Sequence, residues 1–233
     1  MSTNNIEITG FTDQRVDSII EQLQALRPML QEQAPLGEKL RCPTEKADAA
    51  LRELDMYNLL TPVRWGGAGL STTGLARVQM EMAKCDPSLS WVVQILNGTT
   101  WVASLTSDAL QESLFGNGPA PVCGAYNPPG KAKKVDGGYI VSGSWPYSSG
   151  SRQAVWYQGG CMIDDDGGPV VPGINMAYIP MSEVEIVDSW YVTGMQGTGS
   201  DTVVAKDVFI ADHMMVTMDK PFGYIEEGKK HVG

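Results

Sequence analysis

The residues best suited to chemistry lie at positions 143–150, which read Gly-Ser-Trp-Pro-Tyr-Ser-Ser-Gly. This stretch offers an indole, a phenol and serine hydroxyls directly after a short run of strand-forming residues at 139–141. Flat aromatic surface beside small hydrogen-bonding groups is what a flat heteroaromatic cofactor needs. The same residues also suit a Gly/Ser-rich turn with an aromatic corner, and both interpretations stay open at this point.

The cysteines and histidines do not indicate metal chemistry. The four cysteines are far apart and form no Cys-x-x-Cys pair, so neither a zinc site nor a disulfide framework is predicted. The two histidines, His213 and His231, are isolated as well. Cys85 precedes Asp86-Pro87, a helix-start pattern that could lower the pKa of its thiol, although a plain reduced thiol fits the sequence better. We therefore predict no metal site.

Charge and hydropathy exclude two classes of partner. The chain has 233 residues, a hydrophobic content of 42% and a formal net charge of −10. Nucleic acid and anionic membranes are bound through basic surface, so neither partner is predicted. No apolar run approaches the roughly 20 residues of a membrane span, and the polar N-terminus lacks the pattern of a signal peptide. We therefore expect a cytoplasmic protein.

Apolar spacing predicts five helices in the first half of the chain. From about Asp13, apolar residues recur every three or four positions, which indicates an amphipathic helix that Pro28 should end. Four more helices are predicted from N-cap residues at Thr44, at 71–73, at Asp86 and at Ser107. The helix after Asp86 is apolar nearly all round, so we expect it to be the central buried helix.

The pattern changes after Pro121. Short runs rich in Val, Ile, Tyr and Trp alternate with turn residues, which is typical of an antiparallel barrel or sandwich. The predicted strands are residues 122–126, 138–143, 154–160, 175–179, 184–188 and 202–210. Asp136-Gly137 favours a tight hairpin, and the aspartate-rich stretch 164–168 is predicted to be a solvated loop. The predicted fold class is α+β, with an N-terminal all-α helical domain followed by an antiparallel β-barrel domain.

Four motifs, in order, resemble those of the acyl-CoA dehydrogenase superfamily. Residues 63–71 are similar to its Pro-Glu-x-Gly-Gly-x-Gly-Leu-Ser segment, and Asp-Pro-Ser-Leu-Ser-Trp at 86–91 resembles the start of its buried helix. Residues 190–201, followed by Val-Phe-Ile at 208–210, resemble a signature of its β domain. The stretches at 143–150 and 197–201 are most similar to two-component flavin-dependent monooxygenases of this fold. These include hydroxylases of phenols, hydroxyphenylacetate and steroid rings, and enzymes that act on indole-type substrates.

The resemblance covers roughly residues 15–215 and implies a domain organisation. It implies a helical domain at 1–118, a middle β-barrel domain at 119–217, and a linker or the start of a C-terminal helical bundle at 218–233. In the family this bundle carries the catalytic histidine of the monooxygenases, binds the flavin phosphate and builds a tetramer. Because the chain stops where the bundle should begin, we expect an incomplete form that binds flavin poorly.

The family's chemistry implies a function and a set of partners. A separate flavin reductase supplies reduced FMN or FAD, molecular oxygen adds to the flavin, and the C4a-hydroperoxyflavin that results hydroxylates an electron-rich substrate. The resemblance therefore implies the oxygenase component of a monooxygenase that acts on a small aromatic substrate. At full length it implies a homotetramer.

Residue roles follow from the same resemblance. Ser149 is expected to be catalytic, because it would form a hydrogen bond near flavin N5. The other expected cofactor-binding residues are Asn127, Trp145, Tyr147, Ser148, Gly197, Thr198, Gly199 and Ser200. Trp91, Asn97 and Trp101, on the buried helix, are expected to line the substrate cavity. Each has a structural alternative, a turn hydroxyl or backbone contact for the small residues and core packing for the aromatic ones.

Two other functions stay open. An acyl-CoA dehydrogenase-like oxidoreductase would use oxidised FAD, but that group's Thr-Glu-Pro-x-Ala-Gly-Ser stretch is replaced by Asn-Pro-Pro-Gly-Lys-Ala at 127–132. A non-catalytic truncated fragment would instead bind a partner through the surface that the bundle should cover.

Overall fold

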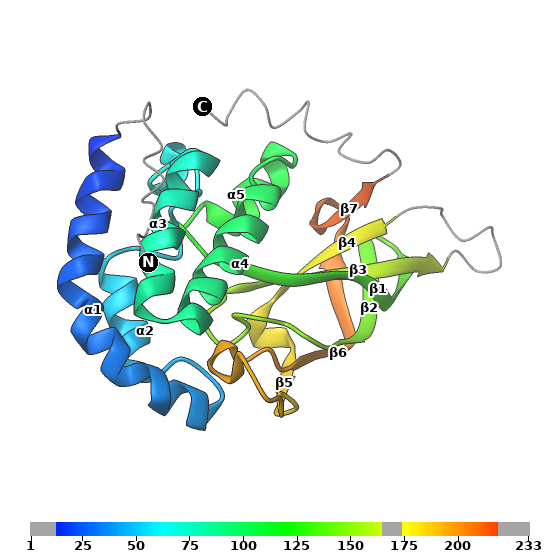
Figure 1. Cartoon of the computed structure of the whole chain (residues 1–233). Coiled ribbons are helices and arrows are strands. Elements are labelled where there is room, and N and C mark those ends of the chain that lie inside the picture. Colours follow the sequence, from blue (N-terminus) through cyan, green and yellow to red (C-terminus); the bar gives the residue numbers. More distant parts are fainter. Residues whose placement is uncertain (1–12, 165–173, 219–233) are drawn as a thin grey trace.

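The computed structural model describes residues 13–164 and 174–218, and within them helices precede strands (Figure 1). The helices are α1 (Gln14–Leu40), α2 (Glu45–Glu53), α3 (Thr72–Cys85), α4 (Pro87–Ala103) and α5 (Asp108–Phe115). The strands are β1 (Val122–Val135), β2 (Gly138–Trp145), β3 (Trp156–Asp164), β4 (Ile174–Pro180), β5 (Glu185–Val187), β6 (Thr202–Ala211) and β7 (Met215–Met218). The predicted order of a helical region followed by a β region is confirmed.

Local side-chain caps set the starts of the later helices, as predicted. Thr44 Oγ1 accepts a hydrogen bond from the Ala47 amide, and Asp86 accepts from the amides of Ser88 and Leu89. Such caps satisfy the first amides of a helix, which have no partner within it. Ser71 and Ser107 cap α3 and α5 in the same way. Within the described residues, none of the helices is long and apolar enough to cross a membrane.

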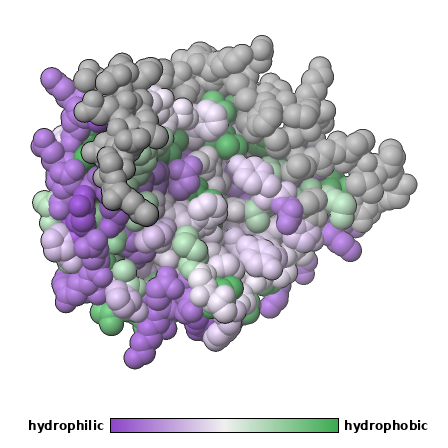
Figure 2. Space-filling model, in the orientation of Figure 1, coloured by the Kyte–Doolittle hydropathy of each residue, from purple (hydrophilic) through white to green (hydrophobic). Residues whose placement is uncertain are grey.

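Helix α1 is longer than predicted, because it continues through Pro28 and Pro35 to Leu40. Both prolines face solvent, as do Gln24 and Gln31, whose carbonyls lose their helical partners to the prolines. Water can satisfy those carbonyls, so the cost of each proline is reduced. The opposite face of α1 buries Val16, Leu23 and Leu30, which holds the helix together across the prolines. Strongly hydrophilic residues gather over α1 in Figure 2.

Helix α4 lies between α3 and the sheet, as expected of a central helix. Val92, Val93 and Leu96 are fully buried, and Thr100 Oγ1 accepts a hydrogen bond of 2.9 Å from the amide of Val122, the first residue of β1. Trp91 is an exception on this helix, because 46% of its surface is exposed. Its position becomes important for the site described below.

The strands form one curled sheet in the order β5-β6-β2-β1-β3-β4-β7. The Asp136-Gly137 hairpin joins β1 to β2 as predicted, with Val135 opposite Gly138. The sheet is mixed rather than wholly antiparallel, because β1 and β3 run parallel. After β2 the chain crosses over β1, so β3 pairs with the edge of β1 opposite to β2. Sequence runs alone do not show which strands become neighbours, so this pairing was not predicted.

Two further differences concern the strands. β1 runs to Val135, well past its predicted end at residue 126, with an irregularity between Ala125 and Gly130. β7 was not predicted, and it pairs with β4. The aspartate-rich stretch 164–168 and the segment 218–233 lie almost wholly outside the described residues. The predicted domain boundaries stay predictions.

Candidate functional site

The motif at residues 143–150 covers the end of β2 and the connection that leads to β3. This connection passes the start of β1, where the Val155 amide donates to the Pro121 carbonyl. Tyr147 and Gly150 have φ values of 63° and 76°, so the chain turns sharply in a region that favours glycine. A Cβ on Gly150 would lie 3.1 Å from Leu96. The turn is therefore packed tightly against α4.

Trp145, predicted to wall the cofactor, lies in the core of the sheet. It is fully buried, and its Nε1 donates to the Gly160 carbonyl at 2.8 Å. A Cβ added at Gly130, Gly143 or Gly159 would come within 2.5, 2.5 or 2.8 Å of the indole ring. The ring fills space over three neighbouring strands and leaves no open face for stacking. Trp145 thus takes the packing role that the sequence left open.

The Ser148 hydroxyl also forms hydrogen bonds that stabilise the turn. Its Oγ is buried, donates to the Trp145 carbonyl at 2.9 Å and lies 2.9 Å from the Tyr157 hydroxyl. Because its only proton goes to the carbonyl, Ser148 accepts the proton of Tyr157. Burial raises the pKa of Tyr157 well above its ordinary value, so this phenol stays neutral and can donate.

Ser149 stands at one end of a chain of hydroxyls. Its Oγ lies 2.6 Å from Ser200 Oγ, and Ser200 Oγ lies 2.7 Å from Thr198 Oγ1. Thr198 Oγ1 in turn donates to the Met195 carbonyl at 2.9 Å. On its other side, Ser149 Oγ accepts from Trp91 Nε1 at 3.0 Å. Residues predicted separately from two motifs and from the buried helix therefore meet at one point.

The ends of this chain fix the direction of its protons. A carbonyl oxygen can only accept, so the single proton of Thr198 points to Met195. Ser200 must then donate to Thr198, and Ser149 must donate to Ser200. Because the indole N–H is only a donor, Ser149 accepts from Trp91. Ser149 Oγ is left with one lone pair, which can only accept a hydrogen bond from a ligand.

Exposed aromatic rings lie beside this acceptor. Tyr147, two residues from Ser149, is 70% exposed, and its ring packs edge-on against Trp190 with centroids 6.0 Å apart. The 46% exposed indole of Trp91 is bonded to Ser149 directly. The Trp91 indole therefore provides flat apolar surface next to a nearly buried hydroxyl, and Tyr147 adds an exposed ring in the same turn. That combination suits a flat ligand with an N–H group at its edge.

The remaining predicted residues are divided between surface and core. Asn127 is exposed on the irregular part of β1, between Ala125 and Gly130. Asn97 is fully buried, and its amide group is bonded to the Leu60 amide and to the Met56 and Val93 carbonyls. Trp101 is partly buried against the hydrophobic core. Asn97 thus connects α4 to the backbone at residues 56 and 60 within the helical region.

Asp201 has a role that was not predicted, although it ends a recognised motif. One carboxylate oxygen accepts two hydrogen bonds from Arg152, at 3.0 and 2.7 Å. The other oxygen accepts from the amides of Ser189 and Trp190. The side chain is 1% exposed and ties three segments of the site together. A buried aspartate after Gly-Ser could have indicated such a role, but its partners are distant in the sequence.

Cys85 does not have the lowered pKa that its position before a helix suggested. Burial raises the pKa of its thiol above the ordinary value and outweighs the effect of Arg27 nearby. Asp86 lies beside it, and burial also raises the pKa of that carboxyl group despite two amide hydrogen bonds. Across residues 13–164 and 174–218, no group of three or more His, Cys, Asp or Glu side chains could hold a metal ion.

Comparison with known proteins defines the class of the chain. Residues 23–115 match the family described as acyl-CoA dehydrogenase, N-terminal domain. The crystal structure of the HsaA monooxygenase from M. tuberculosis superposes with a TM-score of 0.85 at 32% identity, covering 93% of this chain and 57% of that one. Residues 23–115 therefore resemble the N-terminal domain of the acyl-CoA dehydrogenases, and the helical region and curled sheet together share the fold of that monooxygenase.

Two curated proteins and a second crystal structure are also similar to the chain. The chain is 34% identical to the flavin-dependent monooxygenase oxygenase subunit HsaA of Mycobacterium tuberculosis, over 90% of this chain and 53% of the relative. It is 31% identical to the FADH(2)-dependent resorcinol hydroxylase oxygenase component of a Rhizobium species, over 78% and 44%. XiaF from Streptomyces, solved with FADH2 and glycerol, superposes with a TM-score of 0.83 at 27% identity, covering 88% and 52%. The chain thus spans about half the length of these relatives.

Proposed function

We propose that the chain carries the flavin-facing part of the oxygenase component of a flavin-dependent monooxygenase that hydroxylates a small aromatic compound. The relatives named above support this class, because HsaA is named as the oxygenase subunit of a flavin-dependent monooxygenase and the Rhizobium protein as the oxygenase component of a resorcinol hydroxylase. Reduced FMN or FAD is the proposed cofactor and molecular oxygen the co-substrate. A separate flavin reductase is the proposed partner, with assembly as a homotetramer in the cytoplasm.

The observation that carries this proposal is the single acceptor site on Ser149. Reduced flavin has a hydrogen on N5, whereas oxidised flavin has a lone pair there. Because the proton of Ser149 points to Ser200, its oxygen can accept from the N5–H of reduced flavin but would repel the N5 of oxidised flavin. The site chemistry therefore fits the reduced cofactor. It does not favour a dehydrogenase, which must bind the oxidised form to accept a hydride.

Other residues would hold the ring and exclude water. Trp91 offers flat surface next to Ser149, Tyr147 offers an exposed ring in the same turn, and the Met195–Ser200 segment fixes the Ser149 hydroxyl. When bound, reduced flavin supplies two electrons and two protons. One oxygen atom of O₂ then enters a C–H bond of the substrate to give C–OH, and the other leaves as water. The chain's own task is to orient the reduced ring and keep its N5 proton engaged.

An anaerobic titration with reduced and oxidised FMN and FAD tests the proposal. We expect the wild-type chain to bind a reduced flavin more tightly than its oxidised form. In Ser149→Ala the acceptor is lost, so affinity for reduced flavin should fall by roughly fivefold to tenfold. In Ser200→Ala the Ser149 proton is freed to turn outward, so affinity for oxidised flavin should rise.

Ser151→Ala is the matched control, because Ser151 Oγ is buried in the same turn and has no hydrogen-bond partner among the described residues. This variant should bind both flavin forms as the wild type does. Preference of the wild type for oxidised FAD would replace the proposal with a dehydrogenase-like function. Absence of binding to every flavin tested would favour a non-catalytic role for this chain.

A further inference from the structure

The turn at Met195–Gly199 is held in an unusual conformation. Met195 has a φ of 58°, a left-handed value that is unfavourable for a residue with a side chain, and Gly199 has a φ of 56°. The short helix η3 (Gln196–Thr198) lies between them. This turn provides the Met195 carbonyl, where the hydroxyl chain from Ser149 ends. Whatever fixes the turn therefore also fixes the direction of the Ser149 proton.

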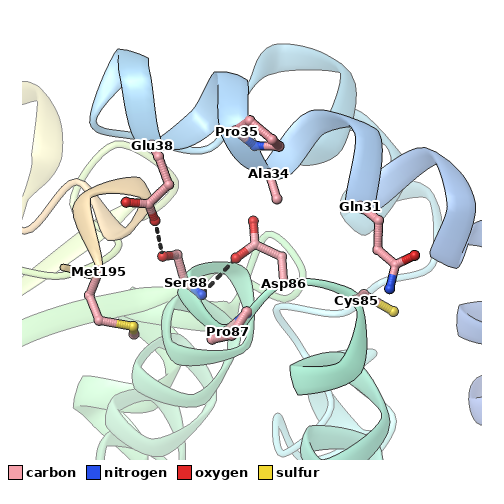
Figure 3. Close-up of a pocket in the computed structure, with 9 residues that line it drawn as sticks. All are labelled: Gln31, Ala34, Pro35, Glu38, Cys85, Asp86, Pro87, Ser88 and Met195. Atoms are coloured by element: carbon pink, nitrogen blue, oxygen red, sulfur yellow. Dashed lines mark hydrogen bonds between the residues drawn. The ribbon is translucent and has the colours of Figure 1, made fainter.

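The Glu38 carboxylate holds this turn from the last part of α1. Its Oε2 accepts from the Gln196 amide at 3.1 Å, and its Oε1 accepts from the Gly197 amide at 3.1 Å. Oε1 also accepts from Ser88 Oγ at 2.7 Å, at the start of α4. Figure 3 shows Glu38 directed at Ser88 with Met195 alongside. One carboxylate thus connects α1, α4 and the turn.

The position of Glu38 is unfavourable for the stability of α1 itself. A negative charge in the last turn of a helix is opposed by the helix dipole. The same charge is favourable toward the start of α4 and toward two backbone amides. The fit is close as well, because a Cβ on Gly197 would lie 3.1 Å from Ser88 Cβ and 3.3 Å from Glu38 Oε1. A side chain at 197 would therefore crowd Ser88 and the carboxylate, which would have to shift by a few tenths of an ångström.

We infer that Glu38 is a positioning residue for the flavin site. Through the Gln196 and Gly197 amides it fixes the turn that orients Thr198 and Ser200, and through them it makes Ser149 an acceptor. This inference rests on the proposed function. Glu38 also borders a pocket of about 460 Å³ between α1 and the start of α4. Water in that pocket can reach the turn amides when the carboxylate is changed, so a substitution at Glu38 is compatible with folding.

The test combines amide hydrogen exchange with flavin titration. Glu38→Gln replaces one accepting oxygen with an NH₂ group, which cannot accept from an amide. Without flavin, exchange of the Gln196 and Gly197 amides should accelerate by roughly tenfold or more, while circular dichroism stays unchanged. The preference for reduced over oxidised flavin should fall by about threefold or more. Glu32→Gln is the matched control, because Glu32 is exposed on the same helix, and it should change neither measurement.

Either of two results overturns the inference. Unchanged exchange at Gln196 and Gly197 in Glu38→Gln would mean that the carboxylate does not hold the turn. Faster exchange with an unchanged flavin preference would mean that the turn does not set the Ser149 proton. Amide exchange is measured without flavin, so it tests the role of Glu38 even if the proposed flavin function is wrong. Failure of the proposed function would instead appear as a lack of preference for reduced flavin in the wild-type titration.

Discussion

A serine hydroxyl can donate or accept, and its neighbours decide which. Ser149 lies between an indole that only donates and a chain of hydroxyls that ends at a carbonyl. Its role toward a ligand is thereby reduced to accepting. The sequence predicted Ser149 and Ser200 at the flavin and Trp91 at the substrate cavity, because each lies in a recognised motif. It did not predict the proton direction, which depends on contacts between residues far apart in the chain.

The role of Trp145 could not be predicted from its motif alone. Tryptophan in a Gly/Ser-rich motif suits both stacking and packing, and only the fold reveals the glycines on three strands that receive its ring. The deciding information was the spatial proximity of positions 130, 143 and 159. The contacts of Asn97 could not be predicted for a similar reason, since its three backbone partners cannot be recognised in the sequence.

We predict that Trp145→Phe destabilises the protein by about 2–4 kcal/mol, because it leaves a void and an unpaired Gly160 carbonyl. Urea unfolding measures the loss. Flavin affinity of the folded fraction should stay near that of the wild type. Trp156→Phe, at a partly buried tryptophan of β3, should cost less. Weakened flavin binding with unchanged stability in Trp145→Phe would instead mean that the indole contacts the cofactor.

At the scale of elements, the end of α1 braces the loop that leads to the site. Arg41, which caps α1 in a left-handed conformation, forms two hydrogen bonds of 2.6 and 2.9 Å with Asp188. Its guanidinium carbon lies 3.8 Å from the centre of the Tyr191 ring, and the Tyr191 hydroxyl donates to Asp188. Together with Glu38, Arg41 attaches both ends of the 188–197 segment to one helix.

This brace should respond to acid. The hydrogen bonds from Arg41 lower the pKa of Asp188 from its ordinary 3.8 to about 2. A lowered carboxyl pKa contributes stability that is fully present above about pH 4 and is lost as the pH falls toward 2. The difference in unfolding free energy between wild type and Asp188→Asn should therefore shrink over that range in urea titrations.

The matched control for this prediction is Asp136→Asn, because Asn-Gly suits the same hairpin turn as Asp-Gly. This variant keeps the Arg41–Asp188 hydrogen bonds, so it should still lose the contribution of that pair between pH 4 and 2. A wild-type advantage over Asp188→Asn that persists unchanged at pH 2 would contradict the brace. The expected effect is small, since half of the Asp188 side chain is exposed.

Element starts were predictable where their causes are local. Thr44, Ser71, Asp86 and Ser107 each cap a helix within three residues of their own position, so short windows of sequence contain the whole cause. The passage of α1 through two prolines and the parallel pairing of β1 with β3 have causes elsewhere in the fold. The first depends on packing of the buried face, and the second on which strand a connection passes.

At the scale of the whole molecule, several buried or bidentate contacts join helices to sheet. Thr100 accepts from the first amide of β1, Trp91 donates to Ser149, and Glu38 binds the turn before β6. Arg52 adds a hydrogen bond to the Gln153 carbonyl in the connection between β2 and β3. The helical region and the sheet therefore share contacts that neither could satisfy alone.

We predict that the two regions unfold together. Far-ultraviolet circular dichroism, which is dominated by the helices, and near-ultraviolet signals from buried Trp145 and Tyr157 should show coincident transitions in urea. Thr100→Val should move both transitions equally, because it leaves the Val122 amide unpaired at the junction. Transitions that separate already in the wild type would show that the helices and the sheet fold independently.

The Trp145 ring fits against the glycines at 130, 143 and 159, so these four positions depend on one another in size and shape. A bulkier residue at any of these glycines is acceptable only if the ring shrinks, and a smaller ring creates room that one added methyl group could fill. Gly159 is the most favourable place for it, since the three atoms nearest to a Cβ there all belong to Trp145. In homologous proteins, substitutions at these four positions should therefore occur together.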